Sequence, residues 1–93
     1  MSLRTDPAVE HAALPRGGTV TVWVGVPDDS YIARSELTTV DLQLHEGNAV
    51  VATLTTTLDP GQEHEARALA RRVKTALEAG EVGLVAEDLE RFV

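Results

Sequence analysis

The chain contains no cysteine, and its only aromatic residues are Trp23, Tyr31 and Phe92. The absence of cysteine excludes a disulfide framework, a thiolate nucleophile and a zinc site built on cysteine. No apolar run approaches the ~18 residues of a membrane span, and charged residues interrupt residues 1–18, where a signal peptide needs an apolar stretch. We therefore expect one cytoplasmic domain over residues 1–93 without a membrane partner.

Basic residues are also scarce. Lysine and arginine together number 8 against 15 acidic residues, so the formal net charge is −7, and Lys74 is the only lysine. Affinity for nucleic acid rests largely on basic side chains that displace counterions from phosphates, so this balance argues against a nucleic-acid partner. It favours solubility or a basic protein partner. The preference for arginine, with the alanine and valine content, is typical of bacterial proteins from GC-rich genomes.

Aromatic side chains contribute little to the apolar content of the chain. Hydrophobic residues make up 43% of the chain, but valine, leucine and alanine supply most of them. A chain of this length buries only roughly 60 to 65% of the surface that it exposes when unfolded. We therefore expect modest stability, and a core that a partner completes.

Strict alternation of valine with other residues predicts a strand over residues 19–26, buried on one side. Residues 27–30 predict a turn, and a second strand is expected within residues 31–44. The apolar face of that strand comprises Val40, Leu42 and Leu44. A third strand is expected over residues 49–58, with an apolar face that comprises Val50, Ala52, Leu54 and Leu58.

The loop between the second and third strands sets their register. A two-residue loop at Glu46-Gly47 would place Leu44 opposite Ala49, on the wrong face. A three-residue loop over residues 46–48 places Leu44 opposite Val50 and Leu42 opposite Ala52, so both apolar faces coincide. We predict the three-residue loop, with Gly47 or Asn48 in the left-handed conformation.

A helix is predicted over residues 60–79. Asp59 can accept from the first N–H groups, Pro60 suits the first helical position, and Gln62 can reach back as in a capping box. Gly80 ends the helix, and Glu63 with Arg67 forms a favourable i,i+4 pair. One apolar stripe comprises Ala66, Leu69, Ala70, Val73, Ala76 and Leu77.

The two ends of the chain carry weaker signals. Residues 1–18 form an arm or a short helix, the helix running over residues 6–14 with Asp6 as cap and Pro7 at its first position. Residues 83–93 form either a second helix or, over residues 82–85, a short strand. In the helical alternative the inward residues are Val85, Leu89 and Phe92.

Together these elements predict an α+β fold of two layers. A three-stranded antiparallel meander over residues 19–58 packs one face on the long amphipathic helix over residues 60–79, and short helices lie at the ends of the chain.

The sheet face opposite the helix is the candidate interaction face. It comprises Thr21, Trp23, Thr39, Asp41, Gln43, Val51, Thr53, Thr55 and Thr57. Three interpretations stay open: a solvated antiparallel face, a surface for dimerisation or partner docking, and a small-molecule site. A lone tryptophan among threonines favours the second over a purely solvated face, because it would leave a large apolar ring in water.

A candidate basic patch lies on the helix and comprises Arg67, Arg71, Arg72 and Lys74. These side chains either extend over the edge of the core or dock an acidic partner or RNA. The histidines at positions 11, 45 and 64 lack metal-ligand spacing, and no catalytic constellation is visible. We therefore expect a protein that is not an enzyme and that uses no metal or cofactor.

Two resemblances add to this interpretation. Leu58-Asp59-Pro60 after a hairpin, followed by the run of residues 65–72, resembles small uncharacterised actinobacterial proteins with a double-stranded-RNA-binding-domain-like topology. The resemblance implies a helix, a three-stranded meander and a long helix. RNA binders of that topology carry a lysine-rich motif where this chain has Gly-Gln-Glu-His-Glu at residues 61–65, so RNA binding is not implied.

The segment over residues 26–37, Val-Pro-Asp-Asp-Ser-Tyr-Ile-Ala-Arg-Ser-Glu-Leu, resembles the early hairpin of HicB-like antitoxins. That resemblance implies a neutraliser of a basic toxin. The sequence therefore supports a non-catalytic interaction module that forms a homodimer through its sheet face, or binds another protein there. An antitoxin- or immunity-like neutraliser of a basic partner is the alternative.

Overall fold

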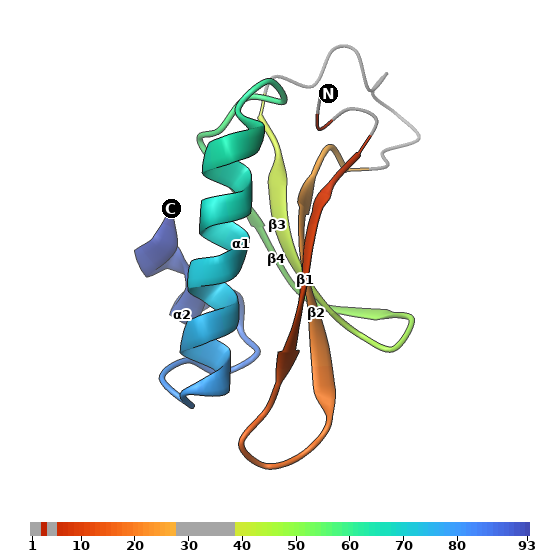
Figure 1. Cartoon of the computed structure of the whole chain (residues 1–93), viewed down its shortest axis with the longest axis vertical. Helices are drawn as coiled ribbons and strands as arrows, with labels where there is room; N and C mark the ends of the chain where they lie inside the picture. Colours follow the sequence, from red (N-terminus) through yellow and green to blue (C-terminus); the bar gives the residue numbers. More distant parts are fainter. Residues whose placement is uncertain (1–2, 4–5, 28–38) are drawn as a thin grey trace.

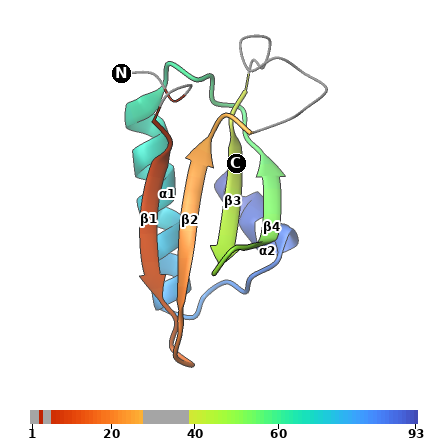
Figure 2. The ribbon, with the colours of Figure 1, turned by 90° about the vertical axis from the view of Figure 1, so that its right-hand side faces the viewer.

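The computed structural model describes residues 3, 6–27 and 39–93 and has two layers, a sheet and a helical layer (Figure 1). The antiparallel sheet has four strands in chain order: β1 (Ala8–Ala13), β2 (Thr19–Gly25), β3 (Asp41–Glu46) and β4 (Ala49–Thr55). The helical layer comprises α1 (Glu63–Glu78), α2 (Ala86–Leu89) and the 3₁₀ turn η2 (Glu90–Phe92). Figure 2 shows α1 behind β1 and β2, and α2 behind the other half of the sheet. The α+β class with an antiparallel meander is confirmed, but the sheet has one strand more than predicted.

The additional strand is β1, where the sequence predicted a short helix over residues 6–14. Ala8 pairs with Val24 and Ala12 with Val20 along the free side of β2. Both alanines are buried under α1, which packs mainly over β1 and β2. The prediction was wrong because alanine has a high helix propensity, whereas pairing with β2 and burial under α1 decide the conformation here.

The pairing of β3 with β4 differs from the predicted register by two residues. Leu44 lies opposite Ala52 and Leu42 opposite Leu54, and the loop is the two-residue turn over residues 47–48. Gly47 has a φ of 63°, as the first central residue of a type II′ turn requires. A β-bulge beside His45 adds one residue to β4 and restores the common face. The predicted faces of Leu42, Leu44, Ala52 and Leu54 are therefore right, although their partners are not.

The stripe that was predicted for α1 is confirmed. Ala66, Leu69, Ala70, Val73, Ala76 and Leu77 are its buried residues. They pack over β1 and β2, and the core beneath the helical layer includes the fully buried valines of β2 and leucines of β3. The helix ends in a Schellman motif, because the Gly80 N–H donates to Leu77 O and the Glu81 N–H donates to Ala76 O. Gly80, with a φ of 72°, is the stop that the sequence predicted.

The start of α1 lies three residues later than predicted, because Asp59 and Gln62 stabilise a turn and not the first helical turn. The Asp59 carboxylate accepts from the Gly61 N–H at 2.8 Å, and Gln62 Oε1 accepts from the Asp59 N–H at 2.9 Å. Pro60 therefore occupies the turn and not the first helical position. The predicted reach of Gln62 back to Asp59 is confirmed.

The C-terminal segment is helical, which decides between its two predicted conformations. Leu89 is fully buried and Phe92 partly buried, but Val85 is 49% exposed, so its predicted inward position is wrong. At the other end Leu3 is buried, and its N–H donates to Pro60 O at 2.9 Å. The predicted turn over residues 27–30 and the predicted strand residues before Thr39 lie mostly outside the described residues.

Thr56 follows β4 and is a buried polar residue that the sequence pattern did not reveal. Its hydroxyl donates to Val40 O at 2.8 Å and accepts from the Leu58 N–H at 3.2 Å. We expect Thr56→Val to lower the free energy of unfolding by about 1–3 kcal/mol, because the Leu58 N–H loses its partner and Val40 O keeps only the bond from the Thr56 backbone N–H. The exposed neighbour Thr57 provides the control. Thr57→Val should change the free energy of unfolding, measured by urea denaturation, by less than ~0.5 kcal/mol. Equal effects of both variants would contradict this role of Thr56.

Candidate interaction face

The sheet face that points away from α1 is uncovered by any described element, and Figure 2 shows it toward the reader. We call it the open face. Strand pairing brings together Val9, His11, Thr21, Trp23, Asp41, Gln43, His45, Val50, Val51, Thr53 and Thr55 on it. The face is broad and follows the sheet, so it suits contact with another macromolecule better than enclosure of a small ligand.

Trp23 lies at the centre of the open face, on one of the two inner strands. Its indole stacks on the His45 ring, with 6.1 Å between ring centroids and 27° between planes. A Cβ atom on Gly25 would lie 3.0 Å from Trp23 Cζ2 and 2.8 Å from Pro7 Cβ. Glycine at this position therefore leaves the room that the indole ring and Pro7 occupy.

Two polar pairs of the open face are satisfied within the face itself. His45 Nε2 lies 2.8 Å from Gln43 Oε1, and His11 Nδ1 lies 3.2 Å from Thr21 Oγ1. A polar group that already has a partner loses less when water is removed from it. These pairs therefore lower the cost of covering the open face.

Valines add apolar surface at two corners of the open face. Val9 is 41% exposed, Val50 52% and Val51 38%. Val50 was predicted on the face under α1, but it lies opposite His45 because of the bulge in β4. The bulge therefore places two consecutive valines on the same side as Trp23.

Asp41 is the only Asp, Glu, Lys or Arg among the described residues of the open face. Burial raises the pKa of its carboxyl group, and a hydrogen bond from the Thr55 hydroxyl partly opposes that rise. The other Asp and Glu residues that the structure describes lie outside the open face. The open face is therefore nearly neutral.

The structure brings most of the predicted interaction residues together. Thr21, Trp23, Asp41, Gln43, Val51, Thr53 and Thr55 lie on the open face. Thr39 precedes β3 and Thr57 follows β4, so neither belongs to a strand. The sequence analysis missed Val9 and His11 because β1 was interpreted as a helix. His45 could have been found, since it continues the alternation of Asp41 and Gln43.

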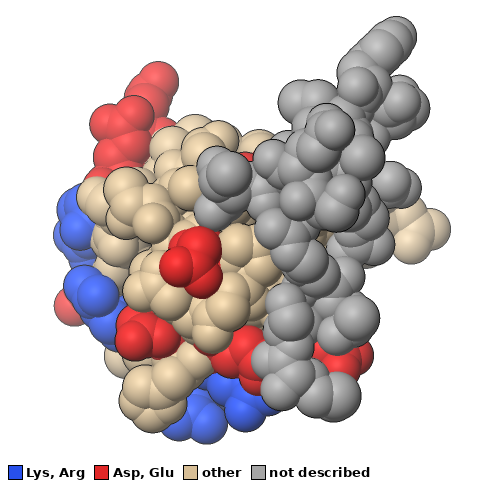
Figure 3. All heavy atoms as spheres, turned by 90° about the horizontal axis from the view of Figure 1, so that it is seen from above, with Lys and Arg blue, Asp and Glu red and all other residues tan. Residues whose placement is uncertain are grey.

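The four residues of the predicted basic patch do not form one surface. Lys74 Nζ lies 3.7 Å from Glu10 Oε1 on β1, and Arg67 pairs with Glu63 at 3.8 Å, as the sequence predicted. Arg72 lies on the opposite flank of α1, with its guanidinium 5.6 Å from the centre of the Phe92 ring. Arg71 has no ion-pair partner among the described residues. Figure 3 shows basic side chains along the left and lower margins of the molecule, with acidic ones among them.

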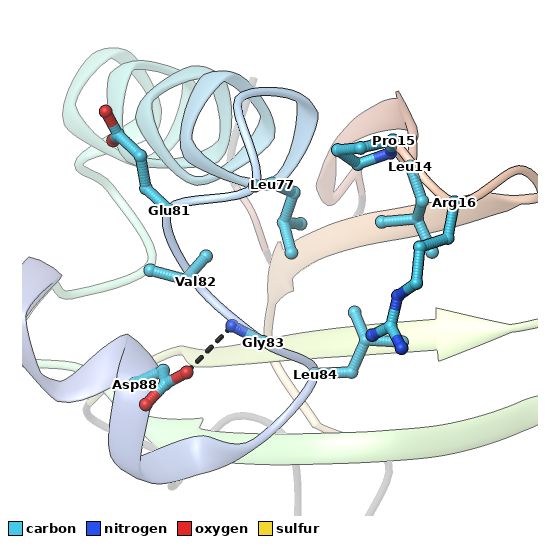
Figure 4. Close-up of a pocket in the computed structure, with 10 residues that line it drawn as sticks. Leu14, Pro15, Arg16, Leu77, Glu81, Val82, Gly83, Leu84 and Asp88 are labelled. Carbon is cyan, nitrogen blue, oxygen red and sulfur yellow. Dashed lines mark hydrogen bonds between the residues drawn. The ribbon is translucent and has the colours of Figure 1, made fainter.

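A separate hollow of about 460 Å³ lies between the β1–β2 hairpin and the segment that follows α1 (Figure 4). Its apolar lining includes Leu14, Leu77 and Leu84. The Asp88 carboxylate accepts from the Gly83 N–H at 2.7 Å, so this acid stabilises the loop, and Glu81 points away in Figure 4. The charged side chains of the lining, Arg16, Glu81 and Asp88, lie apart from one another in Figure 4 and do not converge as catalytic groups do.

Comparisons with protein-family models, curated proteins and solved structures gave no match. The two resemblances in the sequence therefore stay predictions. Within the described ranges, no cluster of three or more His, Asp or Glu side chains could hold a metal ion. None of the helices in the same ranges is long and apolar enough to cross a membrane.

We expect Asp41→Asn to stabilise the protein at neutral pH. A carboxyl group whose pKa is raised on folding binds its proton more tightly in the folded state, so its contribution to stability is lost as the pH rises through that pKa. Asparagine keeps an acceptor for Thr55 without ionising. The gain in unfolding free energy should be present at about pH 7 and vanish below the ordinary pKa of 3.8. Denaturation at both pH values checks this, and an equal gain at both would contradict it.

Proposed function

We propose that this protein is a non-catalytic interaction module that self-associates through the open face. The observation that carries the proposal is the partly exposed Trp23 at the centre of a nearly neutral sheet face that no described element covers. Aromatic residues are enriched and charged residues depleted at the centres of protein interfaces. Trp23 and the valines of the open face match that composition.

The charge distribution supports a second copy as the occupant. The chain has a formal net charge of −7, so two copies repel each other unless they meet through surfaces of low charge. The open face carries a single carboxylate among its described residues, and burial raises the pKa of that group. A basic partner would instead be attracted to an acidic surface.

Covering the open face would also complete a small core. One face of the sheet already packs on the helical layer. The largest fully buried side chains of the core are leucines and valines. Stacking two open faces would bury Trp23, Val50 and Val51 in a second apolar layer. Two sheets pack in this way at a spacing of about 10 Å.

We expect Val50→Lys and Trp23→Ser each to raise the dimer dissociation constant at least about tenfold, because central contacts dominate interface energy. Sedimentation velocity over a concentration series measures the change. Val85→Lys is the matched control, since Val85 is 49% exposed, against 52% for Val50, and precedes α2. It should leave the association unchanged. A wild-type protein that stays monomeric, or equal effects of the two lysine variants, would contradict self-association through the open face.

The net charge supports a second candidate, an antitoxin- or immunity-like neutraliser of a basic partner. The acidic surface outside the open face would then provide the attraction. Native mass spectrometry of protein purified gently from its host separates the two candidates. A homodimer supports self-association, whereas a monomer bound to a basic protein supports the neutraliser.

A further inference from the structure

Strand β1 lies at the edge of the sheet, and part of its outer edge is open among the described residues. The Leu14 N–H donates to Gly18 O across the hairpin, so even-numbered residues of β1 direct their backbone groups toward β2. Residues 9, 11 and 13 therefore direct theirs outward. Glu78 accepts from the Ala13 N–H at 3.3 Å and closes one end. No described group pairs with the outward N–H groups of Val9 and His11.

A basic row of α1 follows this edge. Because Lys74 contacts Glu10 and Glu78 contacts Ala13, the helix runs in the same direction as β1. Arg71 precedes Lys74 by about one turn and Arg67 by about two turns, so both arginines face the open end. Together with Pro7, Ala8, Val9, Glu10 and Ala70, these arginines line a hollow of about 360 Å³.

We propose that an extended acidic peptide segment binds here as a fifth strand beside β1. Its backbone would bond to the outward groups of Val9 and His11, as in other complexes formed by strand addition. Alternate side chains of the added strand would project toward α1. Acidic side chains at these alternate positions would form ion pairs with Arg67 and Arg71.

The spacing of the two arginines matches this mode of binding. Residues four apart on a helix are separated by ~6 Å along its axis, and alternate residues of a strand by ~6.6–6.8 Å. Carboxylates at positions i and i+2 of the added strand can therefore each meet one arginine. Arg71 lacks an ion-pair partner among the described residues, and Arg67 has only the 3.8 Å contact with Glu63.

The charge order along α1 disfavours a second copy at the same edge. Along the flank near β1 the order is Glu63, Arg67, Arg71, Lys74 and Glu78. A two-fold axis level with Arg71, at the centre of this row, would lay two such rows antiparallel, so that basic residues meet basic ones and acidic residues meet acidic ones. An acidic segment has the complementary charge and avoids this repulsion.

The test uses an acetylated and amidated hexapeptide of alternating valine and glutamate, titrated into the full chain and followed by amide NMR. We expect the Val9 and His11 amide signals to shift and their hydrogen exchange to slow. Arg71→Glu should weaken binding about tenfold or more, because it replaces an attraction with a repulsion. Arg72→Glu is the matched control on the opposite flank of α1 and should change binding less than about twofold.

Four results would overturn the proposal: no binding of the glutamate peptide, equal binding of a valine–lysine peptide, equal loss in the two arginine variants, or shifts centred on Trp23 and Gln43. The last result would place the peptide on the open face. The proposal does not depend on self-association, because strand addition uses the outward backbone groups of Val9 and His11, whereas self-association uses the side chains of the open face. Sedimentation of Arg71→Glu without peptide should match that of the wild type.

Discussion

The close approach of α1 to the sheet is the contact on which the rest of the structure depends. Alanines lie on both sides of it, Ala8 and Ala12 on β1 and Ala66 and Ala70 on α1, and all four are buried. Small side chains let the helix lie directly over the edge strand. The larger apolar residues of β2 and β3 then fill the space beside it, and Leu89 extends the core toward β4. A larger side chain on β1 would displace the helix from the edge and open this core.

The position of α1 also decides which surfaces stay available. Because one helical layer covers one side of the sheet, the other side carries residues that do not enter the core. On that side the backbone is adapted at two points. Gly25 leaves room for the Trp23 ring, and the bulge beside His45 turns Val50 outward. Both adaptations enlarge the apolar area of a face that is otherwise built from threonine and internally paired polar groups.

Much of the fold could be predicted from periodicity, and the misses have identifiable causes. The valine alternation of β2 and the stripe of α1 depend on local spacing, which the sequence displays directly. The strand β1 was missed because its short alanine-rich pattern fits a helix as well as a strand. The β3–β4 register was missed because a bulge changes the pairing without changing the faces. For the open face, Trp23 and its threonine neighbours could be predicted, whereas Val9 and Val50 depended on the two missed features.

The sequence by itself determined which residues are buried in β2, β3 and α1, where the helix ends at Gly80, and that the charge is strongly acidic. These properties follow from local spacing, turn chemistry and composition. Only the tertiary structure decided that residues 8–13 form an edge strand, because pairing and burial there outweigh intrinsic propensity. It also decided that the basic row of α1 lies along that edge, since the contacts of Lys74 with Glu10 and of Glu78 with Ala13 join residues far apart in the chain.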